Sequence, residues 1–242
     1  IVHMKAKYNL KFIYHGNACF ELKTPSLTLL FDPFLDDNEK SDVSSGDVFC
    51  DMILLSHAHS DHFGDAAAIA QRTNAIVIGV PEVLGLLPEG VHSHGMNLGG
   101  TVQTQFGSIT MVPALHSSGV AGGCACGYVL SFTDGPTVYY AGDTALFGDM
   151  ELIGRYFHID YAVLPIGDNF TMGPDAAVEA AKMLHAGAVI PVHYNTWPVI
   201  AQDVKAFREK VEGAGMRCHP LAAGQALVLD LDIRDARAKG EL

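Results

Sequence analysis

The sequence has few basic residues and no cluster of them. Its 242 residues include 15 lysines and arginines against 27 aspartates and glutamates, which gives a formal net charge of −12. Proteins that bind nucleic acid independently of its sequence use Lys and Arg side chains to neutralise phosphates. A long nucleic acid is therefore not expected as a partner.

Long apolar runs, the pattern of a signal peptide and the spacing of a disulfide framework are also not found in this sequence. No apolar run approaches the ~18 residues of a transmembrane helix, and the opening stretch IVHMKAKYNL lacks the apolar core of a signal peptide. The five cysteines are odd in number and irregularly spaced, which favours reduced thiols. Cys124 and Cys126 lack the spacing of a zinc knuckle and are interpreted as small buried residues. We expect a cytoplasmic protein without a membrane partner.

The chain is interpreted as a single domain over residues 4–242, because 49% of its residues are hydrophobic and no Pro- or Ser-rich linker interrupts it. Residues 1–3 are interpreted as a cloning remnant before a native Met4. Helices are expected at 65–72, 174–185 and 199–212. Together with the strands this predicts an α+β fold with helices outside packed sheets. Strands are expected at residues 9–14, 19–22, 27–31, 52–56, 75–78, 109–113, 128–133, 137–141, 161–165, 188–192 and 226–231.

The stretch LLSHAHSDHFGD, at residues 54–65, combines ligand-type side chains with the end of an apolar strand. His57 and His59 are two residues apart, so in extended chain both point to the same side. Asp61 and His62 follow at the start of a helical pattern, and a turn there would bring them to a second, neighbouring point. Imidazole and carboxylate together suit Zn²⁺, Mn²⁺ or Fe²⁺ better than Mg²⁺ or Ca²⁺. A solvated polar turn is the alternative interpretation.

Three further candidate ligands follow apolar runs far along the chain. His116 follows residues 109–115, Asp143 follows a strand within the segment YYAGDT, and His193 follows residues 189–192. Each alone could be a capping or hydrogen-bonded polar residue. Together with the HxHxDH motif they favour metal ligands at one edge of a sheet.

At these residues the sequence resembles the metallo-β-lactamase superfamily. The resemblance runs through HAHSDH at 57–62, His116, GDT at 142–144 and His193, in the order of that family. It is closest to a branch of small metal-dependent hydrolases of unassigned substrate, which shares FDPFL at 31–35, GDNFTMGPDAA at 167–177 and HYNTWP at 193–198. The resemblance implies a four-layer αββα sandwich built from two similar halves.

The resemblance also implies a dinuclear site with Zn²⁺ as the expected metal and Mn²⁺ or Fe²⁺ as alternatives. The β-lactamases of the superfamily usually have Cys at the position of Asp143, so β-lactamase activity is not expected. The diiron electron-transfer branch usually has a carboxylate at the position of His59, which disfavours that activity. The implied ligands are His57, His59 and His116 for the first ion, Asp61, His62 and His193 for the second, and Asp143 as the bridge.

The expected activity is hydrolysis by a metal-bound hydroxide, since a metal with an open position lowers the pKa of its water. Asp61 is then both a ligand and a catalytic residue that orients the hydroxide. The expected substrate is a small ester, lactone, thioester or similar electrophile. One alternative is a phosphodiesterase of the same fold acting on a small or cyclic phosphodiester; another is a metal-binding protein without turnover. The sequence does not indicate the oligomeric state.

The residues around the ligands define an expected pocket and its supports. Asp32 and Asp65 are expected to lie behind the ligands, where either carboxylate could orient a histidine, although Asp65 could instead begin a helix and Asp32 could be a plain turn residue. His15 is interpreted as a turn residue. The loops near the ligands contain no Lys or Arg, which favours a weakly charged substrate. The pocket candidates are Asn169, Phe170, Thr171, Tyr194, Thr196 and Trp197.

Overall fold

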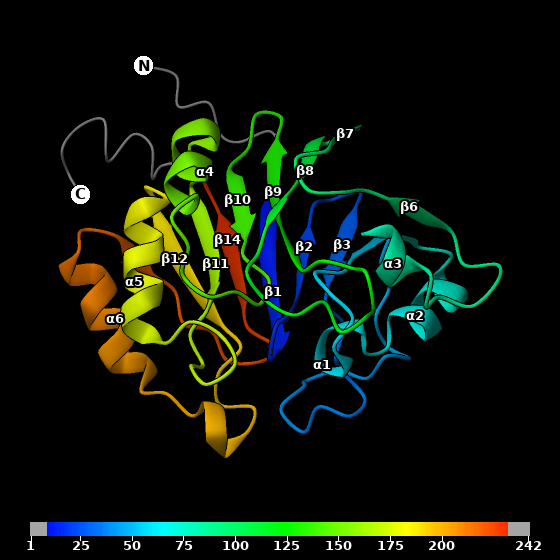
Figure 1. Cartoon of the computed structure of the whole chain (residues 1–242), viewed down its shortest axis with the longest axis horizontal. Helices are drawn as coiled ribbons and strands as arrows, with labels where there is room; N and C mark the ends of the chain where they lie inside the picture. The colour runs from blue at the N-terminus through cyan, green and yellow to red at the C-terminus, as the bar shows by residue number, and fades with distance from the viewer. Residues whose placement is uncertain (1–8, 232–242) are drawn as a thin grey trace.

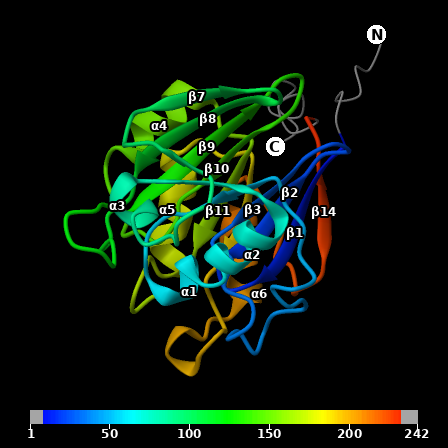
Figure 2. The same ribbon diagram turned by 90° about the vertical axis from the view of Figure 1, so that its right-hand side faces the viewer.

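The computed structural model describes residues 9–231, so the interpretation of residues 1–3 and Met4 lies outside the described part. Two seven-stranded sheets pack face to face, with helices on their outer faces (Figure 1). Figure 2 shows the same layers turned by 90°. The expected αββα sandwich is therefore the fold of this chain. Within residues 9–231, none of the helices has the length and apolar character needed to cross a bilayer.

The first sheet has the strand order β14-β1-β2-β3-β4-β5-β6. Strands β3 to β6 pair in parallel, whereas β14, β1, β2 and β3 pair antiparallel. Its strands are β1 (Leu10–Gly16), β2 (Cys19–Lys23), β3 (Thr28–Phe31), β4 (Met52–Leu54), β5 (Ile76–Gly79), β6 (Ser93–Gly95) and β14 (Ala226–Leu229).

The second sheet has the order β13-β12-β11-β10-β9-β8-β7. Because β9 pairs antiparallel with both β8 and β10, and β10 to β12 pair in parallel, strands β8, β10, β11 and β12 all end at one edge. Its strands are β7 (Thr101–Thr104), β8 (Gly107–Pro113), β9 (Cys126–Phe132), β10 (Thr137–Tyr140), β11 (Tyr161–Pro165), β12 (Ala188–Val192) and β13 (Arg217–Cys218).

Aromatic side chains join the two sheets in the central core. The ring of Tyr140, from the second sheet, meets Phe20 and Phe31 of the first sheet edge-on, with centroid distances of 5.1 and 5.6 Å. Such pairs contribute about 0.5–1.5 kcal/mol beyond the burial of their area. Tyr140 thus fixes the second sheet against β3, whose end lies beside the ligand-bearing loops.

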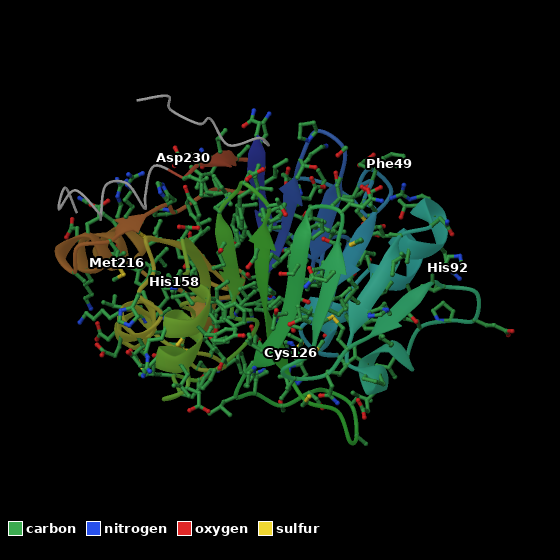
Figure 3. The ribbon with its side chains drawn as sticks, turned by 90° about the horizontal axis from the view of Figure 1, so that it is seen from above. Phe49, His92, Cys126, His158, Met216 and Asp230 are labelled. Atoms are coloured by element: carbon green, nitrogen blue, oxygen red, sulfur yellow. The ribbon has the colours of Figure 1, made fainter. Side chains whose placement is uncertain are left out.

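The helices form the two outer layers. Figure 3 labels Met216 on the side of α5 and α6 and His92 beside β6, so the two halves of the fold lie at opposite ends of the view.

The helix expected over residues 199–212 begins later, because Asp203 caps α6 by accepting hydrogen bonds of 3.0 Å from the amides of Lys205 and Ala206. The helices are α1 (Ser60–Phe63), α2 (Ala66–Thr73), α3 (Pro81–Leu84), α4 (Met150–Phe157), α5 (Pro174–Met183) and α6 (Val204–Gly213), with a 3₁₀ turn η1 at Pro198–Ile200.

Candidate metal centre

Three histidines converge beyond the ends of β4 and β8. Nε2 of His57 lies 2.9 Å from Nδ1 of His59, and Nε2 of His116 lies 3.3 Å from the same Nδ1. The other ring nitrogen of His59, Nε2, lies 3.2 Å from Oγ of Ser117. The structure therefore brings the first expected trio together, with one nitrogen of each ring directed at a common point.

Two carboxylates and two histidines form an adjoining group. The short helix α1 turns Asp61 and His62 toward the second sheet, where Asp143 follows β10 and His193 follows β12. Nε2 of His62 lies 3.3 Å from Oδ2 of Asp61, and Nε2 of His193 lies 3.3 Å from the same oxygen. The second expected set is thus assembled from both sheets.

One oxygen of Asp143 faces both groups. Its Oδ2 lies 3.1 Å from Nε2 of His62 and 3.3 Å from Nε2 of His193. The same atom lies 3.6 Å from Nε2 of His116 and 3.9 Å from Nε2 of His57. Asp143 therefore lies at the junction of the two groups, in the position of a shared ligand.

The donor atoms fit divalent transition metals. Imidazole binds Zn²⁺ at about 2.0–2.1 Å, and tetrahedral ligands at that distance are roughly 3.3–3.4 Å apart. The shortest separations within the groups, 2.9 to 3.3 Å, are close to that spacing. Within residues 9–231, Nε2 of His62 and Oδ1 of Asp143 are buried without a hydrogen-bond partner. Orphaned polar atoms in a buried cluster are costly, and a bound cation would satisfy them.

Burial and neighbouring charges hold His57, His116 and Asp61 in protonation states that suit metal binding. Burial, together with the neighbouring His62, lowers the pKa of His57 to about 2, so His57 is neutral at physiological pH. Burial also lowers the pKa of His116. Burial would raise the pKa of Asp61, but the close contacts of its carboxylate with His193 and His62 outweigh burial and hold the pKa well below its usual value. Neutral imidazoles and an ionised carboxylate are the forms that coordinate metals.

Asp32 supports the ligands from behind, and its side chain is completely buried. Its Oδ2 accepts hydrogen bonds from Tyr140 (2.6 Å), from Oγ of Ser56 (2.5 Å) and from Nδ1 of His62 (2.8 Å). Ser56 gives its only hydroxyl proton to Asp32, so its oxygen must accept from Nδ1 of His57 at 2.8 Å. Both histidines donate through Nδ1 and therefore direct Nε2 at the centre. Metal-binding histidines are commonly oriented by such hydrogen bonds from their second ring nitrogen.

The carboxylate of Asp65 contacts a loop rather than a histidine of the centre. Its Oδ2 accepts hydrogen bonds from the amides of Leu35 (2.9 Å) and Asp36 (3.1 Å), and it thereby holds the loop that follows Asp32. Ser56, rather than Asp65, bonds His57. The expectation that Asp65 begins a helix is confirmed, because Asp65 is the N-cap residue of α2 and its carbonyl accepts a hydrogen bond from the amide of Ile69. The expectation that its carboxylate orients a histidine is wrong, because the chain after β3 passes closer to this carboxylate.

Two of the six expected pocket residues line a cavity of about 550 Å³. Tyr194 and Thr196 form its wall together with Asn17 and Lys40, which the sequence did not single out. Lys40 belongs to a different loop from those that bear the candidate ligands, which contain no Lys or Arg. Thr196 also donates a hydrogen bond of 2.7 Å to Asn17.

The other four pocket candidates lie elsewhere on the loops. Trp197 packs near Phe34, with ring centroids 6.0 Å apart. Phe170 is 54% exposed, and Asn169 and Thr171 flank it on the same loop. The amide of Met172 ties this loop to the carbonyl of Thr144, one residue after Asp143, at 2.9 Å.

His15 and the cysteines stand apart from the two ligand groups. Nδ1 of His15 lies 2.8 Å from Oδ1 of Asp42, and its Nε2 lies 3.6 Å from Glu21. The thiol of Cys126 is buried and donates to the carbonyl of Ser56, whereas Cys124 is half-buried near Asn97. All five cysteines are free thiols.

Known proteins are similar in sequence to most of this chain. The family described as "Beta-lactamase superfamily domain" matches residues 28–194. A UPF0173 metal-dependent hydrolase of Natranaerobius thermophilus is 45% identical over 223 residues, which cover 91% of this chain and 99% of that protein. The UPF0173 metal-dependent hydrolase YtkL of Bacillus subtilis is 44% identical over 214 residues, covering 84% of this chain and 94% of that protein.

Solved structures agree with the fold. Igni18, a metallo hydrolase from Ignicoccus hospitalis, superimposes with a TM-score of 0.83 at 33% identity, covering 90% of this chain and 97% of that one. An isothiocyanate hydrolase from Delia radicum gut bacteria has a TM-score of 0.74 at 21% identity, covering 91% and 99%, and supports the fold alone. The chain belongs to the beta-lactamase superfamily, and it is a metal-dependent hydrolase.

Proposed function

We propose that this hydrolase binds two divalent metal ions, with Zn²⁺ favoured over Mn²⁺ and Fe²⁺. His57, His59 and His116 would hold the first ion, and Asp61, His62 and His193 the second. The observation that carries the proposal is the position of Asp143, whose Oδ2 lies 3.1 to 3.9 Å from a histidine nitrogen of each group. A carboxylate oxygen between two nitrogen clusters is suited to serve both ions.

The protein residues would prepare the centre for hydrolysis. When bound, two such ions supply hydroxide at neutral pH and polarise the substrate oxygen. Asp61 stays ionised, so its carboxylate can accept a hydrogen bond from the attacking nucleophile and orient it. Asp32 orients the ring of His62 directly, and it orients the ring of His57 through Ser56.

A small, weakly charged substrate fits the surroundings. The ligand-bearing loops at residues 57–65, 114–125, 141–149 and 193–203 contain no Lys or Arg. They instead expose large apolar side chains close to the ligands: Leu115 is 56% exposed and precedes His116, and Trp197 is 37% exposed and follows His193 by four positions. An ester, lactone or thioester with an apolar body matches this surface better than a multiply charged phosphate.

A small phosphodiester is the second candidate. Lys40 lines the cavity that also contains Asn17, and Asn17 contacts Asp61 at 3.2 Å. A single cation in this cavity could accept a singly charged phosphodiester. The ligand-bearing loops contain no Arg, which leaves this candidate behind the neutral electrophiles.

Metal content tests the proposal directly. Elemental analysis of protein purified without chelator and reloaded with Zn²⁺ should find about two equivalents, as a two-metal hydrolase requires. Asp143→Asn should hold less, whereas Asp149→Asn, at an exposed carboxylate outside the centre, should hold the wild-type amount. Uptake of a single equivalent by the wild-type protein would sink the two-ion proposal.

The substrate class is tested by a panel of esters, lactones, thioesters and phosphodiesters with added Zn²⁺ or Mn²⁺. Turnover of the neutral substrates supports the first candidate. Turnover of phosphodiesters alone would replace it by the second, and Lys40→Met should then raise KM.

A further inference from the structure

Asn17 lies between ligands from the two sheets. It occupies the turn between β1 and β2, is 1% exposed, and has a positive φ of 50°. Its carbonyl accepts one hydrogen bond from the amide of His193 at 2.7 Å and another from the hydroxyl of Tyr14 at 2.9 Å. The backbone of Asn17, from the first sheet, is thus tied to a candidate ligand at the end of β12.

The side chain of Asn17 has only one orientation that satisfies its neighbours. Oγ1 of Thr196 donates to Oδ1 of Asn17 at 2.7 Å. The amide nitrogen, Nδ2, then faces Asp61 and donates to its Oδ2 at 3.2 Å and to its backbone carbonyl at 3.3 Å. A flipped amide would place its oxygen against two acceptors of Asp61, so Asp61 determines which end of the amide faces it, and the Thr196 hydroxyl holds the other end in place.

The oxygen that Asn17 contacts is the one directed at the candidate metal centre. Oδ2 of Asp61 lies 3.3 Å from Nε2 of His62 and 3.3 Å from Nε2 of His193. A hydrogen bond to this atom fixes the rotation of the carboxylate. Asn17 is uncharged, so it can hold Asp61 without neutralising the charge that a metal ligand needs, which a Lys or Arg at this place would do.

We propose that Asn17 is a positioning residue for Asp61 and that Thr196 keeps the Asn17 amide in the orientation that does so. The inference rests on the proposed metal-binding function. The inference assigns a function to Asn17 and Thr196, which belong to two motifs whose roles the metal ligands alone do not explain. These motifs are YHGNACF at residues 14–20 and HYNTWP at residues 193–198. It also means that the ion bound by Asp61, His62 and His193 depends on a contact between the two halves of the fold.

Zinc binding without substrate tests this inference. Thr196→Val removes the hydroxyl at nearly constant shape, and Thr196→Ser retains it. Asn17→Gly removes the amide at a positive φ, where Gly is tolerated. Thr101→Val is the matched control, because its hydroxyl makes a bond of 2.8 Å to Thr110 between β7 and β8, at the other end of the second sheet from β12.

Chelator competition with Zn²⁺ should show that Thr196→Val and Asn17→Gly each weaken one zinc equivalent about 10- to 100-fold, as loss of such supports does elsewhere. Thr196→Ser and Thr101→Val should bind like the wild type. The double variant should bind no more weakly than Asn17→Gly alone, because both changes break one connection. The metal-free melting temperature of Thr196→Val should match that of Thr101→Val.

Three results would overturn the inference: unchanged zinc affinity in Thr196→Val, an equal loss in Thr196→Ser, or equal weakening of both equivalents. A wild-type protein that takes up no zinc would instead sink the proposed function, and this inference with it. Wild-type uptake combined with an unaltered Thr196→Val overturns the inference alone.

Discussion

Asp32 and His62 are joined by a hydrogen bond of 2.8 Å between Oδ2 of the carboxylate and Nδ1 of the ring, and both side chains are fully buried. The same oxygen accepts from the hydroxyls of Tyr140 and Ser56, so this one oxygen serves three donors. The pKa of His62 is raised because, although burial lowers it, the carboxylates of Asp143 and Asp32 outweigh that effect.

Asp32→Asn should therefore damage both stability and metal binding. An amide turns one acceptor into a donor that faces buried donors, which costs about 1–3 kcal/mol for each partner left unsatisfied. Metal affinity should fall about 10- to 100-fold. Urea unfolding and zinc titration measure the two effects. Tyr140→Phe is the control, since it removes one donor only and should cost about 1 kcal/mol; an equal loss in both variants would contradict this prediction.

Asp61→Asn should abolish most turnover while the protein remains folded. Asp61 is only partly buried, but its carboxylate lies at the centre, where we expect it to orient the nucleophile. The expected loss in kcat is at least about 100-fold, the lower end for groups that take part in proton transfer. Circular dichroism checks the fold. Asp168→Asn, at an exposed loop position, should keep full activity. Retention of wild-type kcat in Asp61→Asn would remove Asp61 from the mechanism.

The metal-free protein should lose stability as the pH falls below about 6.5, the usual pKa of His. The pKa of His57 is lowered to about 2 in the fold, so between these values the unfolded chain binds a proton that the folded chain does not. The stability from neutral His57 is complete above the unfolded pKa and declines by about 1.4 kcal/mol per pH unit below it. His116, whose pKa burial also lowers, acts in the same direction.

His62 has the opposite sign, because its raised pKa contributes stability that is present below about pH 6.5 and is lost as the pH rises. Urea unfolding of metal-free protein at about pH 6 and 5 measures the contribution of His57 and His116 together with that of His219, whose pKa burial also lowers, because His62 is then protonated in both states. His57→Gln should flatten the slope. A wild-type slope of zero in this window would contradict the prediction.

Zinc should stabilise the wild-type protein in proportion to its occupancy. Free zinc at about 100 times its dissociation constant adds about 2.7 kcal/mol for each site that exists only in the folded chain. Chelation should lower Tm, and zinc should restore it. His116→Ala should lose part of this increment, whereas His185→Ala, at an exposed histidine on the outer helical layer, should keep it. An unchanged Tm on chelation of the wild type would contradict metal binding in the fold.

The sequence was most informative where chemistry and local geometry coincide. The HxHxDH segment follows a buried strand and turns into a helix, so its four ligands could be expected at two neighbouring points, and the structure brings them there. His116, Asp143 and His193 were indicated by their places after apolar runs, and the family resemblance assigned them to the two ions; all three lie at the same edge. Membership of a hydrolase family also sets aside the alternative of a metal-binding protein without turnover.

Other features could not be foreseen because they depend on tertiary contacts. Strands β6, β7 and β13 are short and lie at or near sheet edges, so they carry little apolar pattern. The pairing of Asn17 with Thr196 spans 179 positions, and nothing local signals it. Asp65 begins α2, as its place in the sequence indicated, but the contact of its carboxylate with the loop after β3 could not be read from the sequence.

The residues of the candidate metal centre are far apart in the sequence, which affects when the centre can form during folding. Asp61 and His193 meet across 132 positions, and His116 and Asp143 lie between them. Contacts of such long range form only after much of the chain has collapsed. A nascent chain that lacks its last third would expose the first histidines without their partners. Complete metal loading is therefore a late event, which follows synthesis and docking of both halves.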